Sequence, residues 1–262
     1  MPDGHLILNN IRVHYHQAGE GPEVLLIHGW GSSRRMWWHL APGLAARHRV
    51  WALDLPGFGE SDKPADDWYS IPNYTALVRE FIQRMNLGRV HLVGHSMGGL
   101  IAFDVAASHP EAVERLVAIN PVVSGRATLL PLMRFKSSRQ ALGLALRASS
   151  IIFQPMLRES GKLVHGITYL HRRFEDFAKG TVDSILASGR ATTSYNVMPR
   201  LPRITAPTLI IVGNQDPSVP STEGRLAART IPNARLTVLA AGHHPTDDIP
   251  AKTLRVVQDF LE

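Results

Sequence analysis

A serine-centred sequence between an expected strand and an expected helix constrains this chain more than any other feature. Residues 89–93 form an apolar run typical of a buried strand, and residues 99–106 have the apolar pattern of a helix. Between them stands Gly94-His95-Ser96-Met97-Gly98, which matches the pattern G-x-S-x-G. Glycines on both sides of a serine allow a tight, left-handed turn in which strand and helix approach closely. The pattern therefore predicts a nucleophile elbow that presents the Ser96 hydroxyl above the sheet.

The rest of the chain alternates apolar runs with helical patterns. Residues 5–8 and 11–16 predict a hairpin, because Asn9-Asn10 favours a tight turn between two short strands. Further strands are expected at 23–27, 49–54, 113–119, 208–212 and 234–239, and helices at 34–47, 71–85, 221–230 and 251–261. This alternation predicts an α/β fold, in which a largely parallel sheet carries helices on both faces.

The regular alternation stops at Asn120-Pro121 and resumes after Pro202. The stretch between these points is helical in pattern, rich in arginine and without a buried-strand signal. A length of 262 residues fits one core with an insertion. We therefore expect an α/β core domain from residues 1–121 and 201–262. Residues 122–200 are expected to form a helical cap, or lid, over the carboxyl ends of the strands.

Composition excludes several classes of protein. The chain has no cysteine, which excludes disulfides, thiolate catalysis and cysteine-ligated zinc. Hydrophobic residues make up 44% of the chain, but no apolar run is long enough to span a bilayer, so no membrane span is expected. The first residues, Met-Pro-Asp-Gly-His, lack the basic and apolar regions of a signal peptide. A cytoplasmic location is the expectation.

The formal net charge of +6 is unevenly distributed along the chain. The expected cap holds only four acidic residues but twelve basic ones: Arg126, Arg134, Lys136, Arg139, Arg147, Arg158, Lys162, Arg172, Arg173, Lys179, Arg190 and Arg200. A basic patch attracts acidic partners, although arginines also cover ordinary helix surfaces. No nucleic-acid recognition motif accompanies this charge, so nucleic-acid binding is not expected.

A serine hydroxyl needs a neighbouring base to become a nucleophile, and the base needs an acid to orient it. In this architecture the acid and then the base are expected after the serine, each in a loop that follows a strand. Asp216 follows an expected strand and is the predicted acid, with a turn or capping role as its alternative. After the next expected strand come His243 and His244. We predict His243 as the base, because Pro245 restricts the backbone of His244.

The negative charge that develops on an attacked carbonyl oxygen needs fixed backbone N–H donors. Met97 directly follows Ser96 at the start of a helix, where the helix dipole favours negative charge. The loop His28-Gly29-Trp30-Gly31 follows an expected strand, and its glycines allow a tight fold near the substrate. We predict the amides of Trp30 and Met97 as the oxyanion donors, with the Trp30 indole as a wall of the pocket. A plain glycine-rich loop is the alternative.

These features together resemble the α/β-hydrolase superfamily across nearly the whole chain. The motifs are His-Gly-Trp-Gly at 28–31, Asp-Leu-Pro-Gly-Phe-Gly-Glu-Ser-Asp at 54–62, Gly-His-Ser-Met-Gly-Gly at 94–99, the Asp216 loop and Gly242-His243. The resemblance implies an eight-stranded, mostly parallel sheet with a helical cap, and it gives Asp54 a structural role. Ser96 stands where haloalkane dehalogenases and epoxide hydrolases carry aspartate. Asn120 stands where some relatives carry their catalytic acid.

The resemblance implies a serine esterase that acts on a small-molecule ester through an acyl-enzyme, with no cofactor and no metal. Proline iminopeptidases carry tryptophan after the serine, where this chain has Met97. C–C hydrolases share Ser-Met-Gly-Gly but usually have asparagine in place of His95. C–C bond hydrolysis, lactone hydrolysis, perhydrolysis and a low-turnover ligand-binding receptor are the alternatives. His-Gly-Trp-Gly with an arginine-rich cap also resembles the esterases of pimeloyl-acyl-carrier-protein methyl esters. By that resemblance, an acidic acyl-carrier protein would dock on the cap.

Overall fold

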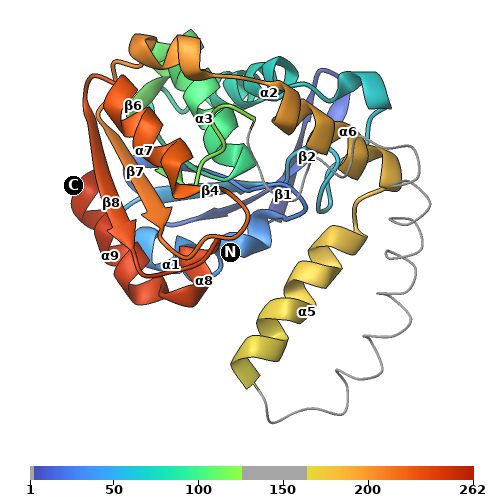
Figure 1. The fold of residues 1–262 in the computed structure, drawn as a ribbon. Helices are drawn as coiled ribbons and strands as arrows, with labels where there is room; N and C mark the ends of the chain where they lie inside the picture. Colours follow the sequence, from blue (N-terminus) through green and yellow to red (C-terminus); the bar gives the residue numbers. More distant parts are fainter. Residues whose placement is uncertain (1–2, 126–163) are drawn as a thin grey trace.

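The computed structural model describes residues 3–125 and 164–262, and these residues form one eight-stranded sheet (Figure 1). The strand order is β1-β2-β4-β3-β5-β6-β7-β8. β2 is antiparallel to β1 and β4, and all other neighbouring strands are parallel. The predicted α/β-hydrolase architecture of the sheet is therefore confirmed. The strands are β1 (Asp3–Leu8), β2 (Ile11–Ala18), β3 (Glu23–Ile27), β4 (Arg49–Leu53), β5 (Val90–His95), β6 (Val113–Ile119), β7 (Thr208–Gly213) and β8 (Ala234–Leu239).

The first two strands form the predicted hairpin. Asn9 and Asn10 connect them with φ angles of 48° and 63°, in the left-handed region that asparagine adopts more readily than most residues. Two consecutive positive φ angles are those of a type I′ turn, whose twist matches that of the flanking strands. The hairpin thus adds an antiparallel edge to a parallel sheet.

Helices cover both faces of the sheet (Figure 1). One face carries α2 (Ile71–Arg84), α3 (Met97–Ser108) and α7 (Ser221–Thr230), and the other carries α1 (Ala41–Leu44) and α9 (Pro250–Leu261). Along β3, Leu25 and Ile27 belong to the first core, whereas Val24 and Leu26 belong to the second. Burial on both faces explains why the central strands are continuous apolar runs. The connections include two 3-10 helices, η2 (Asp66–Trp68) and η3 (Pro110–Ala112).

The prediction of one helix at residues 34–47 is wrong. The structure has a 3-10 helix, η1 (Arg34–Trp37), followed by the single turn of α1. Pro42 stands at the start of α1, and a proline has no N–H to continue a helix from the preceding turn. The break lets Trp37 and Leu40 both pack into the second core. The structure also contains α8 (Pro245–Asp248), which the sequence pattern did not predict.

Between β6 and β7 the described chain contains helices and no strand, as predicted: α5 (Val164–Ala178), α6 (Val182–Ser194) and the 3-10 helix η5 (Met198–Arg203). Buried carboxylates tie this insertion to the core. Glu223 on α7 accepts hydrogen bonds from the amide and hydroxyl of Ser124, and Asp104 on α3 accepts one from the Tyr195 hydroxyl. Residues 126–163 of the expected cap lie outside the described residues, so the cap boundaries stay a prediction.

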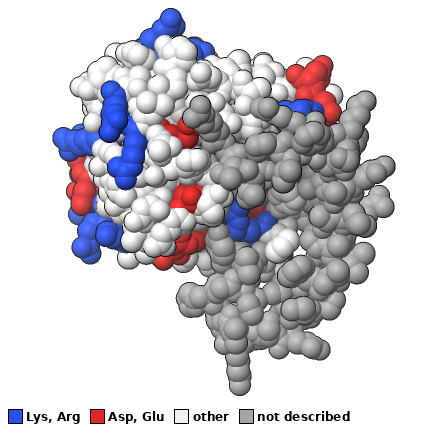
Figure 2. All heavy atoms as spheres, in the orientation of Figure 1, with Lys and Arg blue, Asp and Glu red and all other residues white. Residues whose placement is uncertain are grey.

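Basic side chains are not confined to the expected cap. In Figure 2, Lys and Arg side chains gather on the left of the molecule, where Figure 1 places α7, β8 and α9. The exposed basic residues of these elements are Arg225, Arg229, Arg235, Lys252 and Arg255. In the described part of the cap, several basic residues instead pair with acids of the core: Arg172 with Asp247, Lys179 with Glu60, and Arg200 with Asp104. None of the helices in the described ranges has the length and apolar composition needed to cross a bilayer.

A buried pair of histidines makes the fold sensitive to acid. His91 on β5 packs edge-on against His48, with ring centroids 5.8 Å apart. Burial, with smaller effects from His48 and Arg115, lowers the pKa of His91 to about 4. In the folded protein, His91 therefore stays neutral at pH values just below 6.5, where the same side chain in the unfolded chain binds a proton. We expect the free energy of unfolding to hold its full value above about pH 6.5 and to fall as the pH drops toward 4.

Urea unfolding measured between about pH 7 and pH 4.5 tests this expectation. His91→Gln is expected to flatten part of the pH dependence, and His5→Gln, at an exposed position on β1, is the matched control. Burial also lowers the pKa values of His95 and His244, which contribute in the same direction. An unchanged slope in the His91 variant would show that His91 is not a source of acid sensitivity.

Candidate active site

Ser96 stands at the turn between β5 and α3 with φ 54° and ψ −115°, a strained backbone for a residue with a side chain. Its glycine neighbours leave no room for larger residues. A Cβ on Gly98 would lie 2.2 Å from the Ile27 carbonyl oxygen, and a Cβ on Gly94 would lie 2.3 Å from the Gly98 carbonyl oxygen. The Ser96 amide donates to the Ile119 carbonyl at 2.9 Å, which fastens the turn to β6. The G-x-S-x-G sequence thus forms the strained turn at the end of a strand that the pattern predicts.

Two loops bring an imidazole and a carboxylate to Ser96. His243 follows β8, and its Nε2 lies 3.1 Å from the Ser96 Oγ. Its Nδ1 lies 2.7 Å from the Asp216 Oδ2. Because a carboxylate only accepts, Nδ1 carries the proton and Nε2 holds a lone pair. The Ser96 hydroxyl therefore donates to Nε2, which is the arrangement of a serine nucleophile with its base and orienting acid.

Asp216 is held in place by its own loop. Its side chain is 1% exposed, and its Oδ1 accepts hydrogen bonds from the amides of Ser218 and Val219 at 2.7 and 3.0 Å. These donors occupy one oxygen and leave Oδ2 for His243. The same carboxylate therefore caps its own turn and accepts a hydrogen bond from the imidazole of His243, and its role as the catalytic acid stays a prediction.

The two adjacent histidines have different surroundings. His243 lies between Ser96 and Asp216, whereas His244 is buried and its Nδ1 accepts a hydrogen bond from Arg173 at 3.3 Å. Burial, followed by the effects of His95 and Arg173, holds the pKa of His244 well below its usual range. His244 is therefore a neutral neighbour of the site, and His243 occupies the position predicted for the base.

The two residues predicted to supply the oxyanion donors lie beside Ser96. Met97 is the first residue of α3, and a Cβ on Gly29 would lie 3.1 Å from the Ser96 Cβ, so the Trp30 loop passes beside the serine. Within the described residues, neither the Trp30 amide nor the Met97 amide donates to a protein acceptor, which leaves both for a negatively charged oxygen. The Trp30 indole donates to the carbonyl of Ile185 on α6 at 2.9 Å.

Residues 54–62 form hydrogen bonds that stabilise the loop at residues 28–31, which contains Trp30. Buried Asp54 accepts a hydrogen bond from the Arg34 amide at 2.7 Å. The Leu55 amide donates to His28 Nε2 at 2.9 Å, and His28 Nδ1 donates to the Gly29 carbonyl at 2.7 Å. This bonding pattern needs a neutral imidazole, and burial lowers the pKa of His28 accordingly. Asp54 thus supports the loop that holds Trp30 and takes no place beside Ser96.

Asn120 is a site residue whose role the sequence did not reveal. It directly follows β6, with φ 42°, and its side-chain nitrogen donates to the carbonyls of Gly242 and His243, both at 3.0 Å. Its Oδ1 accepts from the Gly213 amide at 2.7 Å. One side chain thereby ties the loop after β7, which holds Asp216, to the loop of His243. Its only signal in the sequence is its position after an expected strand, where some α/β-hydrolases carry their catalytic acid.

Asn120→Ala is expected to lower the free energy of unfolding and the turnover together. It removes the partners of the Gly213 amide and the Gly242 carbonyl, and a buried group left unpaired costs about 1–3 kcal/mol. Loosening the His243 loop is expected to lower kcat about tenfold, because the base loses its alignment. Urea unfolding and steady-state kinetics measure both effects, with Asn233→Ala, at an exposed position, as the control. Full stability and full turnover in the Asn120 variant would contradict this role.

Three imidazoles meet beside Ser96 but do not fit a metal centre. Ring nitrogens of His95, His243 and His244 lie within 4.8 Å of one another. His95 Nε2 donates to the His243 carbonyl at 2.7 Å, and His243 Nε2 accepts from Ser96. The Nδ1 of His244 faces the Arg173 guanidinium, so a cation there would meet positive charge. The donors in this part of the described chain suit proton transfer rather than metal binding.

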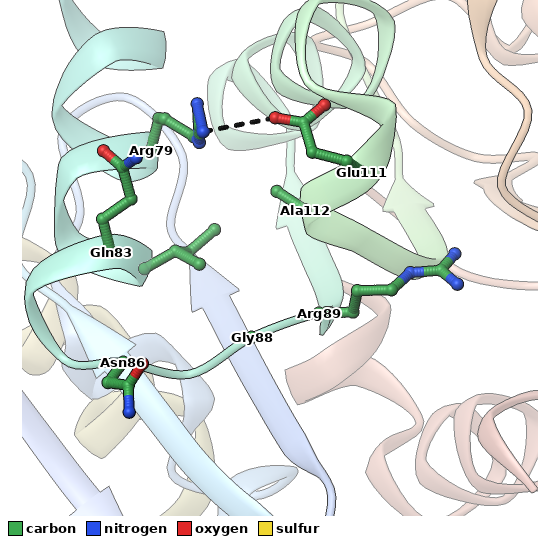
Figure 3. Close-up of a pocket in the computed structure, with 8 residues that line it drawn as sticks. Arg79, Gln83, Asn86, Gly88, Arg89, Glu111 and Ala112 are labelled. Atoms are coloured by element: carbon green, nitrogen blue, oxygen red, sulfur yellow. Dashed lines mark ion pairs between the residues drawn. The ribbon is translucent and has the colours of Figure 1, made fainter.

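Figure 3 shows an open cavity of about 390 Å³. It lies where α2 ends and β5 begins, and Arg79 and Glu111 form an ion pair of 3.3 Å across it. Because the two ends of parallel strands face opposite edges, this cavity is remote from the carboxyl-end loops. None of the predicted site residues lines this cavity. It is lined by Arg79, Ile82, Gln83, Asn86, Gly88, Arg89, Glu111 and Ala112.

Comparison with known proteins connects this geometry to hydrolases. A family model described as the alpha/beta hydrolase fold matches residues 22–248, a range that includes Ser96, Asp216 and His243. A 2-hydroxy-6-oxo-6-phenylhexa-2,4-dienoate hydrolase from Comamonas testosteroni is 30% identical over 269 residues, which cover 97% of this chain and 92% of that relative.

Two further proteins show how widely substrates vary on this fold. A pimeloyl-[acyl-carrier protein] methyl ester esterase from Aeromonas hydrophila is 26% identical over 249 residues, 93% of this chain and 96% of the relative. The solved structure of a bromoperoxidase from Bacillus anthracis superposes with a TM-score of 0.86 at 24% identity, covering 99% of both chains. The fold alone therefore does not choose the substrate.

Proposed function

The chain belongs to the alpha/beta-hydrolase family and is a hydrolase, and from this premise we propose that it cleaves small carboxylic esters through an acyl-enzyme. The observation that carries the proposal is the hydrogen-bonded series from the Ser96 Oγ to His243 and on to Asp216, with distances of 3.1 and 2.7 Å. The open amides of Trp30 and Met97 support it, because acyl transfer needs donors for the oxyanion.

The proposed reaction begins when the Ser96 Oγ attacks the ester carbonyl and His243 Nε2 takes its proton. The carbonyl oxygen becomes negative and is held by the Trp30 and Met97 amides. Asp216 keeps the Nδ1 proton in place and stabilises the imidazolium. His243 then protonates the leaving alcohol, while the acyl group stays on Ser96. A water molecule deprotonated by His243 attacks the acyl-enzyme and releases the acid.

C–C bond hydrolysis is the second candidate, because the relative from Comamonas testosteroni acts, by its name, on a phenylhexadienoate. Ester cleavage fits the arrangement of Ser96 and His243 more simply than C–C bond cleavage does. Its leaving oxygen takes a proton directly from His243, whereas a carbon leaving group requires a separate protonation of carbon. Assays with lactones and with a 2-hydroxy-6-oxo-dienoate, beside esters, separate these reactions.

A series of p-nitrophenyl esters with acyl chains of increasing length tests the proposal. We expect nitrophenolate release and, by mass spectrometry after a rapid acid quench, an acyl group attached to the Ser96 peptide. An organophosphonate that labels serine nucleophiles is expected to block both. If no chain length is hydrolysed above the buffer rate and Ser96 is not labelled, the esterase proposal is wrong.

The acidic acyl-carrier protein expected to dock on the cap stays a prediction. Seven of the twelve basic residues that motivated it lie outside the described residues. Arg190 on α6 is described, and its side chain is 47% exposed and 3.8 Å from Asp66. Arg190→Glu is expected to lower kcat/KM severalfold for a carrier-bound methyl ester, with no effect on the free methyl ester. If the wild-type protein and the Arg190→Glu variant hydrolyse the carrier-bound substrate at equal rates, the proposal of this partner is wrong.

A further inference from the structure

His95, the residue before the nucleophile, contacts the candidate base in two ways. It is the last residue of β5 and is 1% exposed. Its Nε2 lies 2.7 Å from the main-chain carbonyl oxygen of His243. Its ring centroid lies 4.7 Å from that of the His243 imidazole. One buried side chain therefore touches both the backbone and the side chain of the residue that receives the Ser96 proton in the proposed reaction.

The hydrogen bond to His243 fixes where His95 carries its proton. A carbonyl oxygen only accepts, so the proton is on Nε2. Burial, followed by the effect of His243, holds the pKa of His95 well below its usual range, so the ring is neutral and Nδ1 has no proton. Within residues 3–125 and 164–262, this Nδ1 has no hydrogen-bond partner. A Cβ on Gly29 would lie 2.8 Å from it, so Nδ1 lies against a glycine of the loop at residues 28–31.

An imidazole at residue 95 is not the side chain that stability favours. A buried acceptor without a donor loses its hydration on folding and gains no hydrogen bond in return. The His243 carbonyl does not depend on His95 for a partner, because the Asn120 side chain donates to the same oxygen at 3.0 Å. An apolar side chain of similar size would therefore leave no new polar group unpaired. Stability does not explain the presence of His95.

Two donors orient the His243 peptide group more strictly than one. A carbonyl oxygen has two lone pairs, and here it accepts from Asn120, which follows β6, and from His95, which ends β5. With one donor the peptide group still turns about a single hydrogen bond, whereas two donors from neighbouring strands hold it in one orientation. The direction of the His243 side chain follows that of its peptide group. This direction matters because Nε2 has to stay within reach of the Ser96 Oγ, 3.1 Å away.

We infer that His95 is a positioning residue for the base: its Nε2–H group and its ring hold His243 in the orientation that accepts the Ser96 proton. The inference rests on the proposed reaction of Ser96. A misplacement of about 1 Å in a catalytic site lowers turnover by up to about 100-fold. Substrate binding does not need this alignment, so the contribution of His95 is expected in kcat and not in KM.

His95→Leu removes the donor, the unpaired Nδ1 and the ring contact, and it keeps a buried apolar side chain. We expect kcat for p-nitrophenyl butyrate at about pH 8 to fall about 10–100-fold, with little change in KM. The rate at which an organophosphonate labels Ser96 is expected to fall by a similar factor, because the same base activates the serine. The urea midpoint of unfolding is expected to stay the same or to rise, because the variant buries no unpaired acceptor.

His95→Gln distinguishes positioning from packing. The glutamine Nε2 is the same number of bonds from Cα as the imidazole Nε2 and donates in its place. We expect this variant to keep kcat within about threefold of the wild-type value.

His91→Leu is the matched control for His95→Leu. His91 is a buried histidine of the same strand, and its Nδ1 also lacks a hydrogen-bond partner in the described part of the chain. Its ring packs against His48 instead of a catalytic group. The same substitution is therefore expected to leave kcat at about pH 8 unchanged, because it does not touch the His243 loop.

The outcomes separate this inference from the proposed function. Unchanged kcat in a folded His95→Leu variant, or an equal loss of kcat in His95→Leu and His95→Gln, overturns the positioning role and leaves ester hydrolysis by Ser96 standing. If His95→Leu and the more flexible His95→Met both fail to fold, folding needs His95 and the inference is wrong. No hydrolysis of any ester by the wild-type protein, together with no labelling of Ser96, overturns the proposed function and this inference with it.

Discussion

Ser96→Ala is expected to lower kcat for ester hydrolysis by about 10⁵–10⁶, with little change in KM. The methyl group cannot form an acyl-enzyme, and His243 then has no hydroxyl proton to take. A residual rate above that in water is expected, because the Trp30 and Met97 amides still stabilise an oxyanion formed by direct attack of water. Steady-state kinetics with p-nitrophenyl butyrate measure the loss, and the acyl group on the Ser96 peptide is expected to disappear.

Ser194→Ala, on the exposed end of α6, is the matched control and is expected to keep full activity. Thermal unfolding separates catalysis from folding, since alanine fits the Ser96 position without a larger side chain. A Ser96 variant that folds and retains more than a few per cent of the activity would mean that another residue is the nucleophile.

Asp216→Asn is expected to lower kcat about 10⁴-fold with little loss of stability. The amides of Ser218 and Val219 point at one side-chain oxygen, and only an oxygen accepts from them. The new NH₂ group therefore faces His243 Nδ1 and donates to it. The imidazole must then carry its proton on Nε2, where it has no lone pair for the Ser96 hydroxyl.

The expected effect of Asp216→Asn on kcat does not come from the loss of a negative charge alone. Asp259→Asn, at an exposed position on α9, removes the same charge and is expected to leave kcat unchanged. The His243 tautomer in the Asp216 variant is measurable by ¹⁵N NMR, where the proton is expected on Nε2. Full activity with the proton still on Nδ1 would contradict the role given to Asp216.

Local sequence patterns were sufficient to predict the strands and helices that position the candidate active site. The strand, elbow and helix around Ser96 follow from an apolar run, two glycines and a second apolar pattern within about twenty residues. Strand β6 and helix α7 begin and end where the periodicity predicts. Where a proline interrupts the pattern, at Pro42, the prediction of a continuous helix was wrong, because proline has no N–H to continue a helix from the preceding turn.

The order of residues along the chain also indicated Asp216 and His243, since the carboxyl ends of parallel strands meet at one edge. It did not indicate Asn120, whose side chain joins two loops that are about a hundred residues away in sequence. Nor did it indicate that Arg173, one of twelve basic residues in the expected cap, forms a hydrogen bond with His244. Periodicity and spacing in a sequence reflect the secondary structure of each segment and its contacts with residues nearby in the sequence. Hydrogen bonds between distant loops exist only after the sheet has aligned them, so the bracing of the catalytic groups and the charge beside them were visible only in the folded chain.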